Sequence, residues 1–286
     1  MGRAGTGETN RPRIFDMNPL MSILITTKNG YSKGPRPGEW LTLAIDSALA
    51  QDYPNVEVVV CNDGSDDATR ETLEEYAGRT RKLIVVNHHL NRGIAAGFNT
   101  AQEASLGGWV FPMGDDDILE PNFISVMDSH IRRERAIGND LSLCGQWMEF
   151  IDADGNLKSE RAGTATHPDM IRISLSGHGQ FDCGVLAASR DAWNALGGYD
   201  EKWRWGGDLD FALRAIEANY LIGCTPRVLY KYRTTQGGNL WNVSALHTAE
   251  HQSELNEIVR AHQARMVKTG RRMEAPKRGL LHEYRS

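Results

Sequence analysis

Three consecutive aspartates, Asp115, Asp116 and Asp117, stand between a short apolar run and Pro121. Adjacent carboxylates repel one another and raise each other's pKa, so the triplet is unfavourable unless water or a cation screens it. Carboxylate oxygens with open coordination positions suit Mg²⁺ or Mn²⁺ shared with substrate phosphates. If the segment is extended, Asp115 and Asp117 project to one side and Asp116 to the other. The alternative interpretation is a solvated turn before a helix that begins near Pro121.

The residues before the triplet alternate between β-branched runs and apolar residues at helical spacing. This alternation predicts an α/β fold with a mostly parallel, doubly wound sheet that helices cover on both faces. Ligands of such sheets bind beyond the carboxyl ends of the strands. Polar clusters fall at three of these ends, at residues 26–29, 62–65 and 115–117, so we expect them to converge on one crevice. The strands are expected at residues 22–27, 56–63, 82–88 and 107–113, and the helices at 40–51, 65–77 and 93–105.

Composition and charge restrict the classes of function. The 286 residues are 40% hydrophobic, which suffices for one large domain, and a net charge of −5 argues against a protein that coats nucleic acid. The four cysteines are far apart and show no CxxC spacing, so we expect neither a zinc ribbon nor a disulfide framework. No apolar run of about 18 residues and no signal-peptide core occur, so we expect a cytoplasmic protein.

Several motifs follow one another in the order typical of a known family. They are SILITTKN, LAQDYPNVEVVVCNDGSDDAT, NRGIAAGFNTA, MGDDDIL, LGGYDE and GGDLDFALRA. With them, residues 22–233 resemble the family 2 nucleotide-sugar glycosyltransferases, which have the glycosyltransferase A fold. The second motif is the most specific, because it combines the family's Gln-x-Tyr-Pro with its Asp-Gly-Ser turn.

The resemblance implies a domain organisation and a reaction. The nucleotide-sugar half would span about 21–120 and the acceptor half about 121–240, between a flexible arm at 1–20 and a C-terminal helix with a basic tail at 241–286. The enzyme would move a sugar from a nucleoside diphosphate sugar, expected to be UDP-linked, to an acceptor hydroxyl with inversion. Mn²⁺ or Mg²⁺ would bridge the diphosphate and offset charge on the leaving nucleotide.

The resemblance also implies roles for individual residues. Asp63 would accept a hydrogen bond from a base N–H, which is a charge-assisted contact that selects the base. Asp208 would be the catalytic base, with Asp210 beside it, and Asp117 and Asp115 would hold the metal. The nucleotide-binding residues would be Thr27, Asn29, Asp63, Asn91, Arg92, Gly93, Asp115, Asp116 and Arg233.

Two positions depart from the family pattern. Gly114 aligns with the family's first metal-motif aspartate, so either Asp115 or Asp116 pairs with Asp117, and we expect Asp117 at the metal. Gly207 stands in place of the Glu of the family's Glu-Asp pair. The alternative for Asp208 is a structural one, since it lies where a helix N-cap is expected. A second alternative is a nucleotide-sugar-binding protein without catalytic activity.

The residues after position 200 suggest further sites. Trp203 and Trp205 are expected to form a wall for the acceptor, or else to pack under a loop. His247, Glu250 and His251 have the H-x-x-E-H spacing of a zinc peptidase helix, a pattern that arises often by chance.

The C-terminal segment combines an amphipathic helix with a basic tail. The expected helix at 244–268 carries a stripe of Leu255, Ile258, Val259 and Met266, which predicts docking on the domain or on a second subunit. The segment from residue 260 onward contains eight basic and two acidic residues, so its local charge is 8 − 2 = +6. This tail is either solvated or contacts an anionic surface, such as a membrane bearing a lipid-linked acceptor, or nucleic acid. Otherwise the acceptor would be a neutral glycan.

Overall fold

The first half of the chain forms four parallel strands that alternate with helices. The structure is a computed structural model, and it describes residues 18–161, 186–234 and 245–268. The elements of this half are β1 (Met21–Thr27), η1 (Gly30–Ser32), α1 (Glu39–Leu49), β2 (Val56–Asp63), α2 (Thr69–Arg79), β3 (Leu83–His88), α3 (Ile94–Ala104) and β4 (Trp109–Met113). β1 pairs in parallel with both β2 and β4, and β2 pairs in parallel with β3. The four predicted strands and three predicted helices are therefore confirmed.

The second half completes a mixed sheet. Its elements are β5 (Ile118–Leu119), α4 (Phe123–Ala136), β6 (Leu143–Ile151), β7 (Leu157–Arg161), β8 (Ala187–Ser189), α6 (Arg190–Leu196), α7 (Gly207–Glu217), β9 (Ile222–Arg233) and α8 (Ala245–Lys268). β8 joins the halves by pairing antiparallel with β4 and with β6, and the strand order is β3-β2-β1-β4-β8-β6-β9-β5. The α/β fold is confirmed, but the second half is parallel only where β6 pairs with β9.

Two hydrophobic cores lie on opposite faces of the sheet. Ile23 and Ile25 of β1 pack with α1, α2 and α4, whereas Leu24 between them packs with α3, α6 and α7. Side chains alternate along a strand, so a strand covered on both faces must be apolar at every position. This is why β1 and β2 appear in the sequence as continuous apolar runs.

The parallel register brings three strand ends to one edge of the sheet. Thr27 of β1 pairs with Asn62 of β2, and Ile25 of β1 pairs with Met113 of β4. The loops that follow β1, β2 and β4 therefore begin side by side. This edge is the expected place for a ligand in a sheet of this kind.

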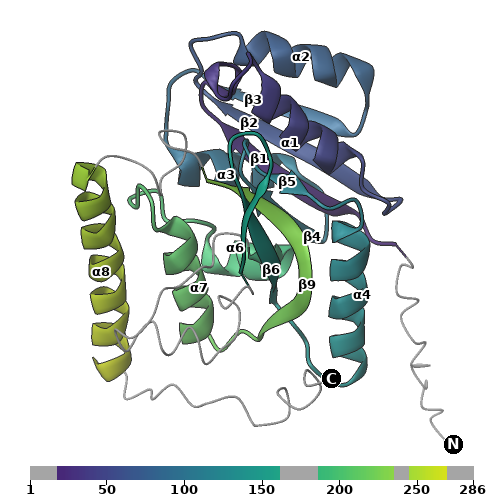
Figure 1. The fold of residues 1–286 in the computed structure, drawn as a ribbon. Coiled ribbons are helices and arrows are strands. Elements are labelled where there is room, and N and C mark those ends of the chain that lie inside the picture. The colour runs from purple at the N-terminus through teal and green to yellow at the C-terminus, as the bar shows by residue number, and fades with distance from the viewer. Residues whose placement is uncertain (1–17, 162–185, 235–244, 269–286) are drawn as a thin grey trace, which may run out of the picture.

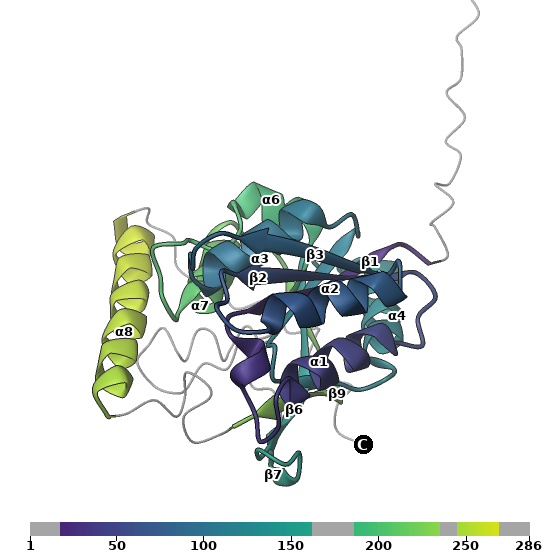
Figure 2. The ribbon, with the colours of Figure 1, turned by 90° about the horizontal axis from the view of Figure 1, so that it is seen from above.

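α8 packs beside α7, on the side of the molecule away from α4 (Figures 1 and 2). Ile258 of α8 is fully buried, and Leu255 and Val259 pack partly buried around it. Of the two predicted docking modes for this helix, the one on its own domain is confirmed.

None of the helices within the described ranges has the length and apolar character needed to cross a bilayer. The predicted arm lies almost wholly outside the described residues, as does the part of the basic tail after residue 268.

Candidate active site

The polar clusters at the ends of β1, β2 and β4 meet, as predicted. The hydroxyl of Thr27, the last residue of β1, donates to Oδ2 of Asp115, which follows β4, at 2.5 Å. The backbone N–H of Asn29 donates to Ser65 Oγ after β2 at 2.9 Å. Segments far apart in the sequence are thus joined by direct hydrogen bonds at one edge of the sheet.

Asp115 turns toward the β1 side of this edge. Its carboxylate accepts from the Thr27 hydroxyl, and both of its oxygens contact Lys33 Nζ, at 2.8 and 2.7 Å. Residues 115–116 form a turn, so the predicted alternation of an extended strand, with Asp115 and Asp117 on one side, is wrong. A turn lets the two carboxylates find donors on different elements, which separates their like charges.

Asp117 turns toward β9 instead. Its Oδ2 accepts from the Tyr230 hydroxyl at 2.6 Å, and its Oδ1 accepts from the backbone N–H of Arg233 at 2.8 Å. Burial raises the pKa of this carboxyl to about 6, although the two hydrogen bonds oppose the rise. Both oxygens are thus occupied by the protein, and a metal-binding role for Asp117 stays a prediction.

Asp116 is the carboxylate of the triplet that no donor holds among the described residues. It is 8% exposed, and burial, followed by the charges of Asp117 and Asp115, raises its pKa well above the ordinary value. A cation would offset this cost. The described residues contain no group of three His, Cys, Asp or Glu side chains that could hold a metal ion unaided. A Mg²⁺ or Mn²⁺ ion at this edge, with oxygen ligands from Asp116 and from substrate phosphates, stays a prediction.

Arg233 is buried and hydrogen-bonds the backbone of the turn at residues 115–116. It is 1% exposed, and its Nε donates to the backbone carbonyl of Asp116 at 2.7 Å. Its Nη1 donates to the carbonyls of Asp152 and Ala153, each at 2.9 Å, and its guanidinium lies 5.2 Å from the centre of the Trp40 ring. In this arrangement Arg233 positions the backbone of the triplet, and its predicted nucleotide contact remains untested.

Gly114 has a steric reason to lack a side chain. A Cβ at this position would lie 2.5 Å from Asp117 Oδ2 and 3.1 Å from Asp116 Oδ1. The departure from the family's aspartate thus goes together with a turn that brings the carboxylates of the next residues close to the backbone at 114.

Asp63 organises the loop between β3 and α3. Its carboxylate accepts from His88 Nδ1 at 2.7 Å and from the backbone N–H groups of Arg92 and Gly93, both at 2.8 Å. Asn91 Oδ1 also accepts from Gly93 N, at 2.9 Å, and Gly93 has φ 94°, which favours glycine. A carboxylate has about four acceptor positions, so one remains for the predicted bond from a base N–H.

The same loop reaches the second half of the chain. Arg92 Nη2 lies 3.2 Å from Glu201 Oε2, and its side chain is half exposed. Asn99 of α3 and Tyr199 exchange two hydrogen bonds of 2.9 Å each. The LGGYDE motif is thereby fastened to the helix that follows the predicted nucleotide loop.

Asp208 lies in the first turn of α7. The helix begins at Gly207 with Gly206 as its N-cap, so the predicted N-cap role of Asp208 is wrong. Its Oδ1 accepts from the N–H of Leu209 at 2.7 Å, and the residue is partly exposed. A role for Asp208 as the catalytic base stays a prediction.

Asp210, by contrast, is buried and paired with other side chains of the protein. It is 3% exposed, and it accepts from Arg214 Nε at 2.6 Å and lies 3.1 Å from His262 Nε2 of α8. Burial alone would raise its pKa, but His262 and Arg214 together lower it to about 2. Asp208 is the better candidate for a base of the two.

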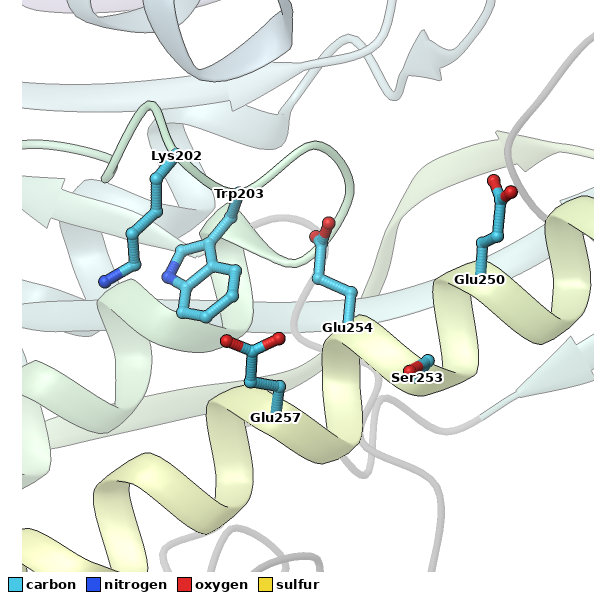
Figure 3. Close-up of a pocket in the computed structure, with 6 residues that line it drawn as sticks. All are labelled: Lys202, Trp203, Glu250, Ser253, Glu254 and Glu257. Atoms are coloured by element: carbon cyan, nitrogen blue, oxygen red, sulfur yellow. The ribbon is translucent and has the colours of Figure 1, made fainter.

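A pocket of about 480 Å³ lies between the 202–203 segment and α8 (Figure 3). Trp203 is only 9% exposed, and Lys202 Nζ lies 4.5 Å from the centre of its ring. Arg204 covers the ring of Trp205 at 4.6 Å in the same way. The predicted acceptor wall of two indole faces is untested, and in this structure both rings already carry a cationic side chain. The pocket is lined by Lys202, Trp203, Glu250, Ser253, Glu254 and Glu257.

The H-x-x-E-H segment gives no support for a peptidase. Glu250 is exposed, and the ring of His251 packs against Trp205 with centroids 6.0 Å apart. The side chain of His247 lies outside the described residues.

The arrangement of strands and helices is that of the glycosyltransferase A fold. S. aureus TarS in complex with UDP-GlcNAc matches with a TM-score of 0.63 at 16% identity, over 87% of this chain and 73% of that one. The mannosyltransferase PcManGT from Pyrobaculum calidifontis, in complex with GDP-Man and Mn²⁺, matches with a TM-score of 0.60 at 19% identity, over 91% and 67%. These likenesses concern the fold.

Residues 22–143 match the family described as glycosyl transferase family 2. An uncharacterized glycosyltransferase of Methanocaldococcus jannaschii is 24% identical over 77% of this chain and 73% of its own length. The chondroitin synthase of Escherichia coli is 30% identical over 70% of this chain, but the chain spans only 27% of that protein. Residues 22–143 are therefore similar to a glycosyl transferase family 2 domain, and the predicted resemblance to that family is confirmed.

Several residues of the site were not foreseen from the sequence. They are Lys33, His88, Tyr230, Glu254 and His262. Lys33 lies in a Gly- and Pro-rich insert, and Glu254 and His262 lie on an amphipathic helix, so neither setting marks them. Only the Tyr-Lys-Tyr-Arg run at 230–233 gave a signal, because it falls where the family places a late metal ligand.

Proposed function

We propose that this protein transfers a sugar from a nucleoside diphosphate sugar to an acceptor hydroxyl, with a divalent metal ion and with inversion at the anomeric carbon. The observation that carries the proposal is the open Asp116 carboxylate, which lies at the carboxyl end of β4 in a turn bonded to β1. A buried carboxylate with a raised pKa at this edge is suited to a cation and a diphosphate.

The donor is proposed to be a UDP-sugar that lies along the edge of β1, β2 and β4. Asp63, at the end of β2, would accept from the base N–H and distinguish it from bases that present an acceptor there. The backbone of Gly93 permits a close approach of the nucleotide. TarS in complex with UDP supports this donor class, whereas PcManGT in complex with GDP-Man leaves a guanosine donor as the alternative.

Asp116 is the residue that we propose to hold the metal ion. The ion would supply Lewis-acid stabilisation of the departing nucleoside diphosphate. Thr27 and Lys33 hold Asp115, and Tyr230 holds Asp117, so the turn presents Asp116 in a fixed position.

Asp208 is proposed as the base that takes the proton of the acceptor hydroxyl. A base in this position contributes about 10²- to 10⁴-fold to the rate. Attack from the face opposite the nucleotide would invert the anomeric centre. Asp210 is the weaker candidate, because its carboxylate is buried against Arg214 and His262, which lower its pKa to about 2 and so make it a weaker base.

The acceptor is proposed to approach from the side of the 200–206 segment. Trp203 Nε1 is buried and finds no acceptor among the described residues, and it borders the pocket in Figure 3. The predicted acceptors remain a glycan, a lipid-linked sugar or a nucleic acid. A cytoplasmic location, contact of the tail with an anionic membrane surface, and a homo-oligomer stay predictions.

A screen of nucleotide sugars by thermal shift, with and without Mn²⁺, tests the donor. A true donor raises the unfolding midpoint, because it binds only the folded protein. Transfer and donor hydrolysis are then measured for the wild type and for Asp208→Asn. We expect the variant to bind the nucleotide as the wild type does and to lose about 100-fold or more of its transfer rate.

Two outcomes would contradict the proposal. Transfer within a few-fold of wild type in Asp208→Asn would remove Asp208 from the role of base. Metal-dependent binding of a nucleotide sugar without hydrolysis or transfer would instead favour an inactive nucleotide-sugar-binding protein, an alternative motivated by Gly207 at the family's Glu position.

A further inference from the structure

The protein supplies a cation of its own to the aspartate triplet. Lys33 follows η1 in the loop between β1 and α1, and its ammonium contacts both oxygens of Asp115, at 2.8 and 2.7 Å. Its side chain is 28% exposed, whereas that of Asp115 is 7% exposed. The ion pair therefore lies at the mouth of the site, with the lysine on the solvent side.

The charges around Lys33 keep it protonated. Burial would lower its pKa, but Asp115, with smaller contributions from Asp116 and Asp67, raises the pKa above its ordinary value. In return, Lys33 favours the ionised form of Asp116 against the effects of burial and of the neighbouring carboxylates. The ammonium of Lys33 thus pairs directly with Asp115, which Thr27 also holds, and its charge also acts on the neighbouring carboxylate of Asp116.

This position gives Lys33 opposite effects on the two ligands of the site. A divalent cation at Asp116 would be repelled by the ammonium, which also occupies the oxygens of Asp115. A diphosphate at the same edge would be attracted by it, since a lysine ammonium has three donors and is a common phosphate contact.

We propose that Lys33 couples metal binding to nucleotide binding: it weakens binding of a divalent cation to the free protein, and it strengthens binding of the diphosphate. The inference rests on the proposed function, because it requires the donor's diphosphate to lie at the triplet. Its consequence is that the Lys33 charge makes the affinity of the free protein for the divalent cation lower, and the affinity of the metal-free protein for the diphosphate higher, than either would be without it.

Isothermal titration measures this directly, with Mn²⁺ alone, UDP alone, and Mn²⁺ in the presence of UDP. The test variants are Lys33→Met and Lys33→Gln, which remove the charge, and Lys33→Arg, which keeps it. Lys231→Met is the matched control, because Lys231 is 33% exposed and its ammonium pairs with Glu120, at 2.8 Å, and with Glu149, not with a carboxylate of the triplet.

We expect the affinities for Mn²⁺ and for UDP to change in opposite directions when the Lys33 charge is removed. Loss of the Lys33 charge should tighten Mn²⁺ binding to the free protein by about tenfold and weaken UDP binding without metal by about tenfold, as a single charge at this range predicts. Lys33→Arg and Lys231→Met should remain within about twofold of wild type, since neither removes the charge at the triplet. A merely disturbed fold would weaken both ligands together.

Mn²⁺ affinity of the free protein within twofold of wild type in both neutral variants overturns the proposal, and so does a parallel loss of both affinities. In either case the proposed function stands as long as wild-type protein still binds UDP and transfers sugar. Failure of the wild type to bind UDP, with or without Mn²⁺, would overturn the proposed function and this inference together.

Discussion

Glu254 of α8 accepts a hydrogen bond of 2.8 Å from the backbone N–H of Gly206, two residues before Asp208. The same carboxylate also accepts from Trp205 N at 2.7 Å and from Arg204 N at 3.1 Å. A Cβ on Gly206 would lie 2.5 Å from Ile258 of α8, so the helix and this turn are in close contact. The segment leading to the candidate base is thus held by a helix that lies outside the residues matched to the family.

Glu254→Ala tests whether this contact positions Asp208. The change leaves two partly buried N–H groups, of Trp205 and Gly206, without their acceptor, so we expect the free energy of unfolding to fall by about 1 to 3 kcal/mol. We also expect kcat for transfer to fall about tenfold or more, because misplacing a catalytic group slows the chemical step. UDP affinity should not change, since Glu254 contacts no part of the proposed nucleotide site.

Glu257→Ala is the matched control for this variant, because Glu257 is exposed on the same helix and lines the same pocket. Its stability and kcat should be those of the wild type. An equal loss of UDP affinity and kcat in Glu254→Ala would show a general disturbance and not a positioning role.

Asp210→Asn should destabilise the protein in a pH-dependent way. The folded-state pKa of Asp210 is lowered to about 2, so its ionised form contributes stability above the ordinary pKa of about 4 and loses it as pH falls toward 2. At pH 7 we expect the variant to be less stable than the wild type by about 2 kcal/mol. Urea titrations from pH 2.5 to 7 measure the difference, and a gap that does not narrow in acid would contradict this origin.

Asp116→Asn should stabilise the metal-free protein, in contrast to Asp210→Asn. Burial and the neighbouring carboxylates raise the folded-state pKa of Asp116, so ionisation costs stability as pH rises from about 4 to above that raised pKa. The metal-free variant should therefore be more stable than the wild type at pH 8, with the gain lost near pH 4. Thermal unfolding in EDTA measures this gain. The same variant should lose metal-dependent nucleotide binding, and wild-type binding in Mn²⁺ would exclude Asp116 as the ligand.

Gly114→Ala and Gly207→Ala together test whether the glycine at each position is required because a side chain would not fit. At position 114 the new methyl would meet Asp117 Oδ2 at 2.5 Å, so we expect a loss of about 1 to 3 kcal/mol and weaker UDP binding in Mn²⁺. At position 207 the nearest atoms lie 3.8 Å away, so Ala should be tolerated and should add up to about 1 kcal/mol as a better helix former. Equal stability of the two variants, measured by urea unfolding, would contradict the role of Gly114 in the turn.

Sequence reasoning located the first half of the fold well, because its signals are local. β2 spans residues 56–63 as predicted, because its centre, residues 58–61, is the apolar run expected of a strand buried on both faces. Asp63 and the triplet were found because they directly follow such runs. The second half was less predictable: β8 has only three residues, and its antiparallel pairing with β4 joins positions about 80 residues apart.

The sequence by itself determined the family, the alternation of strands and helices, and the edge of the sheet at which the polar residues gather, because periodicity and motif order are properties of neighbouring residues. Only the tertiary structure decided which aspartate of the triplet stays open. That choice depends on donors brought from elsewhere in the chain: Thr27 and Lys33 take Asp115, and Tyr230 takes Asp117. It also decided that Asp210 is buried against Arg214 and His262, whereas Asp208, in the same turn of helix, is partly exposed. Hydrogen bonds and charge pairs act through space over a few ångströms, so partners 50 to 120 residues away settle what adjacent identical side chains can do.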